Sequence, residues 1–547
     1  MLNLFLNEMP VHLPDDFSMT MNIKNPIFSD IGNYSYPFKI PNTPQNQFII
    51  DFIHRIESTK NPYTQFAGRF EFNGIPVFNG TAKFRIFNKD SFEGTIYDRE
   101  GDFNYRRKNM ALRDFQYYDY HFATEQAGAD FATGCNNKFY PERHVAFPMI
   151  RDLKYNGDYV GPDNQLQYIN YQDNSGVITL LTYFYNHRTF IVPMVFLRSA
   201  LYHIFKGLGY TIPADQDFFN NTDLNKLIIY NSLSNNQLCP DFTYRSTDIY
   251  AKMHLPKISL NEFLVALEGF FNIRFFIDEM HKTVRIIGID SIVSSPEYVD
   301  YDKDVLSIST DLEADFPGIM LGVKMDSGDS YCQTHLEPEM ALFDCLKPEV
   351  DLLGQLPPWP SCEIGDIRYV KSLNAYYTVT STTYPPTWIV STNDFWSRKF
   401  FRSPDKQDEL PLSSLYAPSF GTYSWVECGN ALADWKDISL RLAFVRRYVN
   451  QNFMGAYHST TGYNLWMKQE SSAIPNTVMS QWHKKTLEFK HTTRLVKVVK
   501  LMTVTEFQTL DFSKKVRIHG VNYLIKSIQV NFKKNFITPA LLDLYKC

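Results

Sequence analysis

Alternation of apolar and polar positions dominates the first hundred residues and predicts a β-rich region. The pair Asn73-Gly74 lies between two alternating runs and favours a tight type I′ hairpin turn. One helix interrupts the strands, since Thr43 followed by Pro44 is typical of a helix start and apolar residues recur at helical spacing over residues 48–56. We expect strands at residues 2–6, 17–23, 34–40, 66–72, 75–87 and 92–97.

Two amphipathic segments in the middle of the chain each predict a helix that leads into a strand. The first is a helix at 196–205 with a strand at 209–212. The second begins at Ser259, with Glu262 three residues on as in a capping box, and continues into a strand and hairpin ending at residue 287. The likeness is short, so an internal repeat and two unrelated helices both stay open.

The C-terminal hundred residues return to a strand pattern. The turn at 519–522 joins two short apolar runs and predicts a closing hairpin in which Tyr523 and Ile525 face the core. We expect strands at 438–444, 495–504, 516–518, 523–525 and 527–532, with short helical turns at 477–483 and 504–510.

These patterns predict an α+β fold that is mainly β, with tube-like β-barrels and smaller helix-plus-hairpin domains. The remaining stretches are less regular, with aromatic-rich loops after residue 99 and a Pro/Ser-rich segment after residue 290. The chain divides into an N-terminal β-barrel at 1–100, a loop-rich insertion at 101–190, an α+β region at 191–290, a Pro/Ser-rich β region at 291–435 and a C-terminal β domain at 436–547.

Composition narrows the classes of function. The 547 residues carry 54 Lys and Arg against 59 Asp and Glu, for a net charge of −5, whereas a dedicated nucleic-acid binder is normally basic. Aromatic residues make up 16% of the chain, which excludes disorder. Tyrosine runs such as residues 117–120 suit either a core or an interface between subunits.

The cysteines and the apolar runs indicate the cellular compartment in which the chain is made. The seven cysteines are scattered without a CxxC pair, which favours synthesis in the cytosol over a disulfide framework. The first residues lack the basic and apolar regions of a signal peptide. The most apolar stretch, 189–205, carries Pro193, Arg198 and His203, so we expect no membrane span.

Three aspartates, Asp300, Asp302 and Asp304, form a DxDxD pattern with Asp311 at the twelfth position of a calcium-type loop. Such loops need Gly at the sixth position, where this chain has Val305. We therefore favour a solvated acidic turn that binds calcium poorly.

Other candidate sites are weaker still. Cys332 and His335 have metal-like spacing without a second pair, and no HExxH joins His483, Glu488 and His491. Residues 326–329 read as an ordinary turn. A glycosidase carboxylate pair cannot be located from the sequence. The sequence therefore predicts no catalytic, cofactor-binding or metal residue, no cofactor and no enzyme.

A basic stretch lies at residues 483–517, where nine Lys and Arg stand against three Asp and Glu. It is compatible with a solvated strand face, a contact with nucleic acid, or a contact with an acidic neighbouring subunit.

The C-terminal third resembles the tail hub, or baseplate hub, proteins of tailed bacteriophages. The resemblance rests on the strand at 438–444, on Trp482 followed by the strand at 495–501, and on the hairpin at 510–525. Upstream, the helix and hairpin at 261–289 and the segments 35–47 and 73–96 are similar to other parts of such hubs.

The resemblance implies two related β-barrels joined by smaller α+β domains in a cyclic homo-oligomer, with a trimer favoured. It implies a structural protein of the virion tail that assembles in the host cytoplasm, caps or extends the tail channel, contacts other tail proteins and transiently meets DNA. The alternatives are a receptor- or glycan-binding fibre or adaptor protein and a surface glycan hydrolase.

Overall fold

The computed structural model shows an α+β protein that is mainly β. Its contacts divide the chain into two compact units. Unit 1 combines residues 1–110, 274–315 and 492–547, and unit 2 combines residues 111–273 and 316–491. The structure describes residues 1–29, 34–55, 57, 64–98, 103, 107–151, 168–180, 191–213, 217–230, 247–278, 281–310, 318–324, 340–344, 367–370, 375–381, 387–390, 413–416, 440–448, 450–455, 463, 465 and 476–547.

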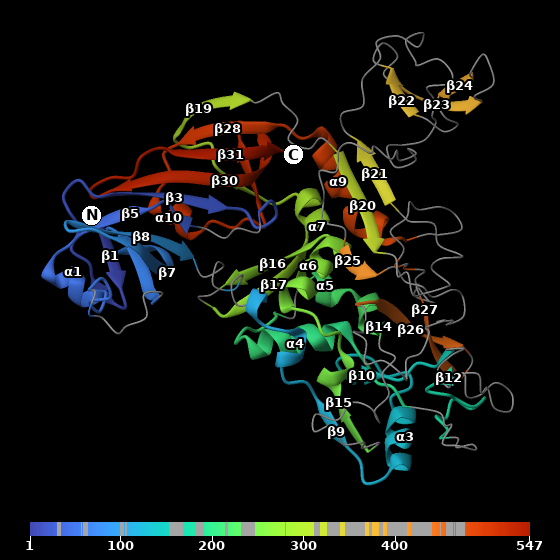
Figure 1. Ribbon diagram of the computed structural model, residues 1–547. Coiled ribbons are helices and arrows are strands. Elements are labelled where there is room, and N and C mark those ends of the chain that lie inside the picture. Colours follow the sequence, from blue (N-terminus) through green and yellow to red (C-terminus); the bar gives the residue numbers. More distant parts are fainter. Residues whose placement is uncertain are drawn as a thin grey trace. The chain divides into compact units, whose positions relative to one another are not determined.

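Unit 1 is built around a 14-stranded sheet (Figure 1). A two-stranded hairpin, β16 and β17, accompanies it. The strands are β1 (Leu2–Leu6), β2 (Met9–Pro10), β3 (Ser18–Lys24), β4 (Tyr34–Ser35), β5 (Phe38–Pro41), β6 (Phe66–Phe72), β7 (Ile75–Phe87), β8 (Ser91–Asp98), β16 (Ile273–Asp278), β17 (Thr283–Gly288), β18 (Tyr298–Asp300), β19 (Val305–Thr310), β28 (Leu495–Lys500), β29 (Lys515–Ile518), β30 (Val521–Lys533) and β31 (Ala540–Lys546), and the helices are α1 (Pro44–Ile49), α7 (Ile289–Ser294) and α10 (Val504–Gln508).

The two ends of the chain meet in this one sheet. β3 pairs antiparallel with β30 from Ser18 opposite Lys533 to Lys24 opposite Ser527. The main strand order is β19-β28-β31-β30-β3-β4-β8-β7-β6-β1-β2, and no pairing among the described strands joins its two ends. The path nevertheless curves back, because Leu2 N–H donates to the carbonyl of Lys534, just after β30, at 2.7 Å. The units are thus discontinuous in sequence, whereas the sequence analysis divides the chain into five consecutive regions.

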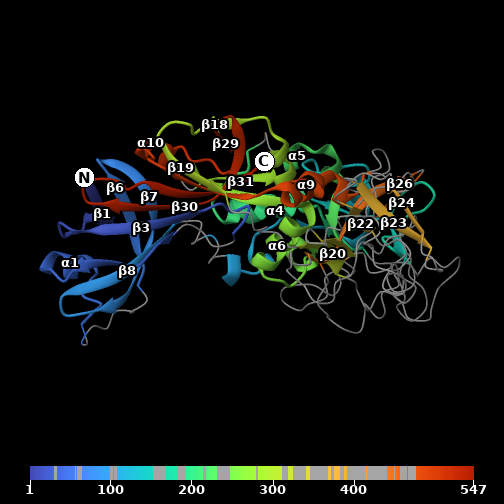
Figure 2. The same cartoon turned by 90° about the horizontal axis from the view of Figure 1, so that it is seen from above.

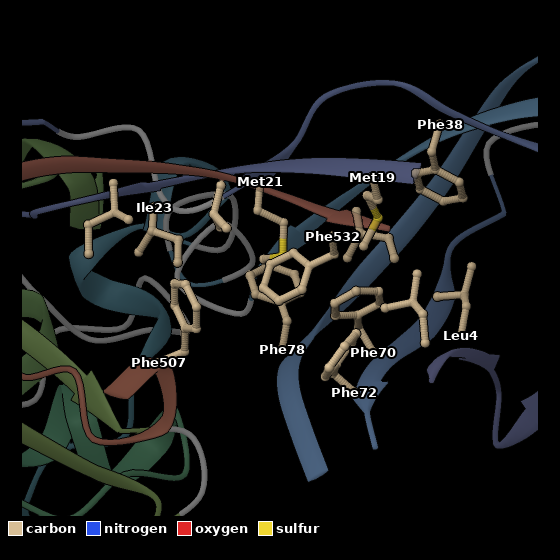
Figure 3. Close-up of a cluster of buried hydrophobic side chains, with 14 of the residues drawn as sticks. Leu4, Met19, Met21, Ile23, Phe38, Phe70, Phe72, Phe78, Phe507 and Phe532 are labelled. Carbon is tan, nitrogen blue, oxygen red and sulfur yellow. The ribbon is translucent and has the colours of Figure 1, made fainter. Parts of the chain in front are cut away.

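Phenylalanine rings from distant segments fill the core of this sheet. Phe532 of β30 lies among Phe70, Phe72 and Phe507, with ring centroids 5.1, 6.4 and 5.5 Å away respectively. Figure 3 shows Phe532 beside Phe70 and Met21 of β3. Burial of such rings contributes about 1.5–3 kcal/mol each, so the core joins the N-terminal and C-terminal strands strongly.

The hairpin turns and helix starts of unit 1 follow the local sequence. Asn73 and Gly74 have φ values of 54° and 76°, as a type I′ turn requires, so that prediction is confirmed. Thr43 caps α1 by accepting from Asn46 N–H. The helix ends at Ile49 rather than near residue 56, because Asp51 and Phe52 turn to positive φ.

The C-terminal hairpin packs as predicted. Val516 of β29 lies opposite Tyr523 of β30, and both are buried in the core together with Ile518 and Ile525. The expected strands at 523–525 and 527–532 form one continuous β30 with an irregularity between Ile525 and Ser527. The last strand, β31, was not predicted.

Unit 2 contains short sheets and helices. It includes α6 (Leu260–Phe271), whose N-cap Ser259 accepts from Glu262 N–H as expected. Its other helices are α3 (Glu125–Gly134), α4 (Leu197–Gly207), α5 (Asp217–Asn220), a π-helical turn (Met479–His483) and α9 (Lys484–Thr492), with short 3₁₀ turns at Leu112–Asp114, Thr222–Lys226 and Ala251–His254. Its strands are β9 (Asp119–His121), β10 (Val145–Ala146), β11 (Ile150–Arg151), β12 (Tyr168–Ile169), β13 (Met194–Val195), β14 (Leu227–Ile229), β15 (Asp248–Tyr250), β20 (Gly318–Lys324), β21 (Met340–Asp344), β22 (Ile367–Val370), β23 (Ala375–Ser381), β24 (Thr387–Val390), β25 (Ser413–Tyr416), β26 (Leu442–Tyr448) and β27 (Gln451–Gly455).

Buried amides tie the small sheets of unit 2 together. Asn170 donates to the carbonyls of Pro148 and Val192 and accepts from Val192 N–H. Gln172 exchanges hydrogen bonds with the backbone of Asn452 in β27. Such satisfied polar groups fix segments far apart in the chain. The described part of residues 208–213, after α4, holds no strand, so only α6 leads into the expected hairpin.

Candidate assembly surface

Strand β19 forms one end of the main strand order of the large sheet. In the described chain it pairs with β28 (Figure 1). Both of its faces are largely exposed. Leu306 and Ile308 on this strand are 55% and 39% exposed. A sheet edge with exposed apolar side chains and unpaired backbone groups is a template for a further strand.

The register explains why the apolar side chains of β19 are uncovered. Ile308 lies opposite Val498 and Thr310 lies opposite Val496, and both valines are buried in the core of unit 1. Residues that face each other across an antiparallel pair share one face of the sheet. The core-facing side of the sheet therefore continues past β28 onto β19, where the described part of the chain leaves Ile308 partly open to solvent.

Strand β18 adds a second exposed apolar pair. It runs parallel to β29, and Tyr298 and Val299 are both exposed. The guanidinium of Arg517 in β29 lies 4.2 Å from the centre of the Tyr298 ring, a cation–π contact between the two strands. We call Tyr298, Val299, Leu306 and Ile308 the edge patch.

The DxDxD aspartates form the turn between these two strands. The carboxylate of Asp300 accepts from Asp302 N–H at 2.9 Å, and that of Asp302 accepts from His519 N–H in the turn after β29. Asp304 has a φ of 60°, and its carbonyl accepts from Leu501 N–H. The first two carboxylates thus bind backbone groups at different places; Asp311 lies outside the described residues.

A buried lysine anchors the same turn. Lys500 at the end of β28 makes an ion pair with Glu506 at 3.1 Å, lies 5.4 Å from the centre of the Tyr301 ring and donates to the carbonyl of Lys303. Burial raises the pKa of Tyr301 to about 12, with the Glu506 charge as the smaller cause. The turn is therefore held from within the unit.

The basic stretch is partly used inside unit 1. Lys515 is buried and donates to the carbonyl of Ser295, and Lys514 pairs with Glu297 at 3.7 Å. Arg494 and Lys497 are exposed. Structural contacts therefore account for several of the cations that the sequence leaves open to nucleic acid or a partner.

The remaining candidate residues do not converge. His483 is buried and its Nε2 lies 2.9 Å from the carbonyl of Phe270; burial lowers the pKa of His483 to about 4. Glu488 instead pairs with Lys485 at 3.0 Å. Cys332, His335 and residues 326–329 lie outside the described part of the chain. Within the described residues, no group of three or more His, Cys, Asp or Glu could hold a metal ion, and no helix is long and apolar enough to cross a membrane.

The tyrosine run at 117–120 divides between core and surface. Tyr117 is buried and donates to the carbonyl of Leu112 at 2.9 Å, whereas Tyr118 is exposed.

The edge patch was missed by sequence reasoning, although the uncharged run at 305–310 between aspartates was a signal that could have located it.

Comparisons with known proteins add two weak structural likenesses. Neither a protein-family model nor a curated protein matches the chain. The 43 kDa tail protein of prophage MuSo2 from Shewanella oneidensis is 7% identical over 99% of this chain and 97% of that chain, with a TM-score of 0.30. A tail protein from Neisseria meningitidis MC58 is 7% identical over 100% of this chain and 95% of that chain, with a TM-score of 0.31. Likenesses at these identities and TM-scores carry no argument for the function of this chain.

Proposed function

We propose that this protein is a structural subunit of a phage tail, at the hub or baseplate, which caps or extends the tail channel and connects it to distal tail components. The observation that supports this proposal is the edge patch, where Ile308 continues the core-facing side of the large sheet beyond β28 without cover from the described residues. The resemblance of the C-terminal third to tail hubs supports the same function. In this proposal the protein acts by geometry rather than by catalysis.

The partner at the edge patch is a second copy of this chain, and charge decides how the copies meet. Among the described residues 297–310, Glu297, Asp300, Asp302 and Asp304 are acidic and Lys303 is basic, and Glu297 pairs with Lys514. Two such edges facing each other would repel, so the same edge does not pair with itself. The exposed Arg494 carries charge of the opposite sign, whereas the exposed Lys497 lies opposite Ser309 of β19 and belongs to the same edge.

A contact between two different surfaces of identical subunits closes into a ring when the rotation between subunits permits. A ring, with a trimer favoured, suits a protein placed around a channel. Interfaces of this obligate kind typically bury more than about 2,000 Å². The edge patch then contributes part of a larger contact.

The test is the oligomeric state of the full chain, measured by light scattering and negative-stain microscopy. We expect a closed ring in the unaltered protein and smaller species in Leu306→Glu and Ile308→Glu. Ser307→Glu is the matched control, since it adds the same charge to the other face of β19. A monomer at micromolar concentration, or oligomers that all three variants leave intact, would contradict the assignment of the edge patch. A monomer that binds glycans would instead support a receptor-binding protein.

A further inference from the structure

A pair of histidines in unit 2 lies where α4 begins. The N-cap residue of α4, Phe196, makes no side-chain capping bond, but its N–H donates to the carbonyl of His144 at 3.1 Å. The Nδ1 atom of His144 lies 2.8 Å from the hydroxyl of Ser199 in the first turn. His144 therefore contacts the start of the helix through both its backbone and its ring.

The second histidine lies one turn further along the same helix. His203 is 9% exposed, and its Nε2 atom is buried without a hydrogen-bond partner. Its ring centre lies 5.6 Å from that of His144 and 4.9 Å from that of Tyr118. Tyr118 also stacks on His144 at 4.0 Å, so the two imidazoles and this tyrosine join α4 to the segment before β9.

The charged side chains that α4 itself carries are positive. Arg198, which is buried, and Lys206 lie on that helix. The ionisable groups in ring contact with the pair are phenols: Tyr117 and Tyr118 before β9, Tyr140 before His144, and Tyr202 on α4 itself.

The neighbouring carboxylates bind elsewhere. Asp114 accepts from Ala111 N–H, and Glu142 pairs with Lys138. Burial raises the pKa of Asp119, against a backbone hydrogen bond with Ala251 and the charge of Lys252, which lower it. The pair is therefore placed to stay neutral.

We propose that His144 and His203 form an acid-sensitive latch that holds the start of α4 against residues 115–118 and opens when the imidazoles take up protons. A proton on His144 places a cation beside the positive N-terminal end of a helix, which is unfavourable. A second proton on His203 places two cations side by side, with Lys206 as a further positive charge nearby. This inference does not depend on the proposed function.

The pKa shifts of both histidines also predict that acid opens the latch. Burial lowers the pKa of His144 to about 4, with His203 as the second cause. Burial also lowers the pKa of His203, with Lys206 next. Closing lowers the pKa of His144 from 6.5 to about 4. The closed state therefore keeps its full stability above about pH 6.5, where His144 is neutral in both states, and loses stability as the pH falls toward 4. For His144 alone this shifts the opening equilibrium by roughly 30-fold at pH 5.

The experiment is hydrogen–deuterium exchange of the full chain at pH 7.5 and pH 5.0, with rates corrected for the intrinsic pH dependence. We expect peptides from α4 and residues 115–121 to lose about 30-fold protection at pH 5.0, while β30 in unit 1 does not. In the double variant His144→Gln, His203→Gln the loss should shrink to a few-fold.

Two further variants act as controls. His281→Gln changes an exposed histidine that pairs with Asp278, and His483→Gln changes a different buried histidine of unit 2. Both should leave the pH response of α4 unchanged. Unchanged α4 protection at pH 5.0, or a loss that persists in the double variant, would overturn the latch.

A second measurement needs no variant. Histidine C2 hydrogen exchange of the unaltered protein reports the pKa of each imidazole directly. The latch requires His144 to titrate well below the ordinary range of a histidine. Titration of His144 near pH 6.5 would refute it even if the variants failed to fold.

Discussion

Replacing Phe532 with alanine tests the claim that one aromatic cluster joins the two ends of the chain. Phe532 is fully buried, and its ring contacts Phe70 and Phe72 of β6 and Phe507 of α10. Truncating a buried phenylalanine costs about 3–5 kcal/mol of stability, because apolar contact is lost and a cavity remains. The three ring contacts place Phe532→Ala near the upper half of that range, at about 4 kcal/mol.

Urea unfolding of the full chain, followed by hydrogen exchange of peptides from β3 and β30, measures this loss in unit 1. With a denaturant dependence of about 2–3 kcal/mol/M, a loss of about 4 kcal/mol lowers the midpoint by roughly 1.3–2 M. Phe536→Ala is the matched control: the same substitution is made four positions away at a side chain that is 54% exposed. It should cost no more than about 0.5 kcal/mol.

A midpoint of unit 1 that Phe532→Ala lowers no more than Phe536→Ala does would contradict a joining role for the cluster. A loss of protection in the β30 peptides without one in the β3 peptides would contradict it too. In that case the N-terminal strands would be held by contacts other than the cluster around Phe532.

Three further substitutions test the hairpin, the buried lysine and the acidic turn. Tyr523→Ser removes a buried ring opposite Val516, so we expect a loss of roughly 2–4 kcal/mol in unit 1, and an unchanged melting temperature would contradict this packing. Lys500→Ala removes the ion pair with Glu506 and the hydrogen bond to the carbonyl of Lys303, while Glu506 still accepts from Thr503, so we expect a loss of about 1–3 kcal/mol by urea unfolding; an unchanged midpoint would show that the lysine does not hold the turn. Calorimetry should find no submicromolar calcium affinity in the unaltered chain, and such an affinity abolished by Asp302→Ala would overturn the assignment of a structural turn.

Local signals in the sequence located the features that depend on neighbouring residues. The Asn73-Gly74 turn, the cap at Thr43 and the cap at Ser259 each place a short-range hydrogen bond or a positive φ in a few residues. The packing of Tyr523 follows from alternation along one hairpin. Such features need no knowledge of the rest of the chain.

Other elements carried weaker signals. The segment of α3 contains two glycines and small side chains, and that of α9 is mostly polar, so neither shows a strong apolar stripe. β31 does alternate, with Ala540, Leu542 and Leu544 buried, and this signal was overlooked. Weak amphipathicity therefore explains why the two helices were not predicted, whereas the sequence of β31 does carry a strand pattern.

Pairings across the chain could not be predicted from local patterns. That β3 pairs with β30, and that β19 lies at the end of the sheet with Ile308 beside buried Val498, depends on contacts between residues hundreds of positions apart. The edge patch exists only because of that strand order. The charges around it could be counted from the sequence, but its exposure could not.

The pairing of β3 with β30 also sets a limit on when unit 1 can form during synthesis. The side chain of Asn25, just after β3, donates to the carbonyl of Ile525, a residue 500 positions later. At a translation rate of about 5–20 residues per second, the ribosome needs roughly 25–100 s to make the residues between them. During that interval the nascent N-terminal strands have apolar faces and an unpaired edge, so they are candidates for chaperone binding or aggregation. A ribosome that stops before β30 would release a chain in which those strands never acquire their partner.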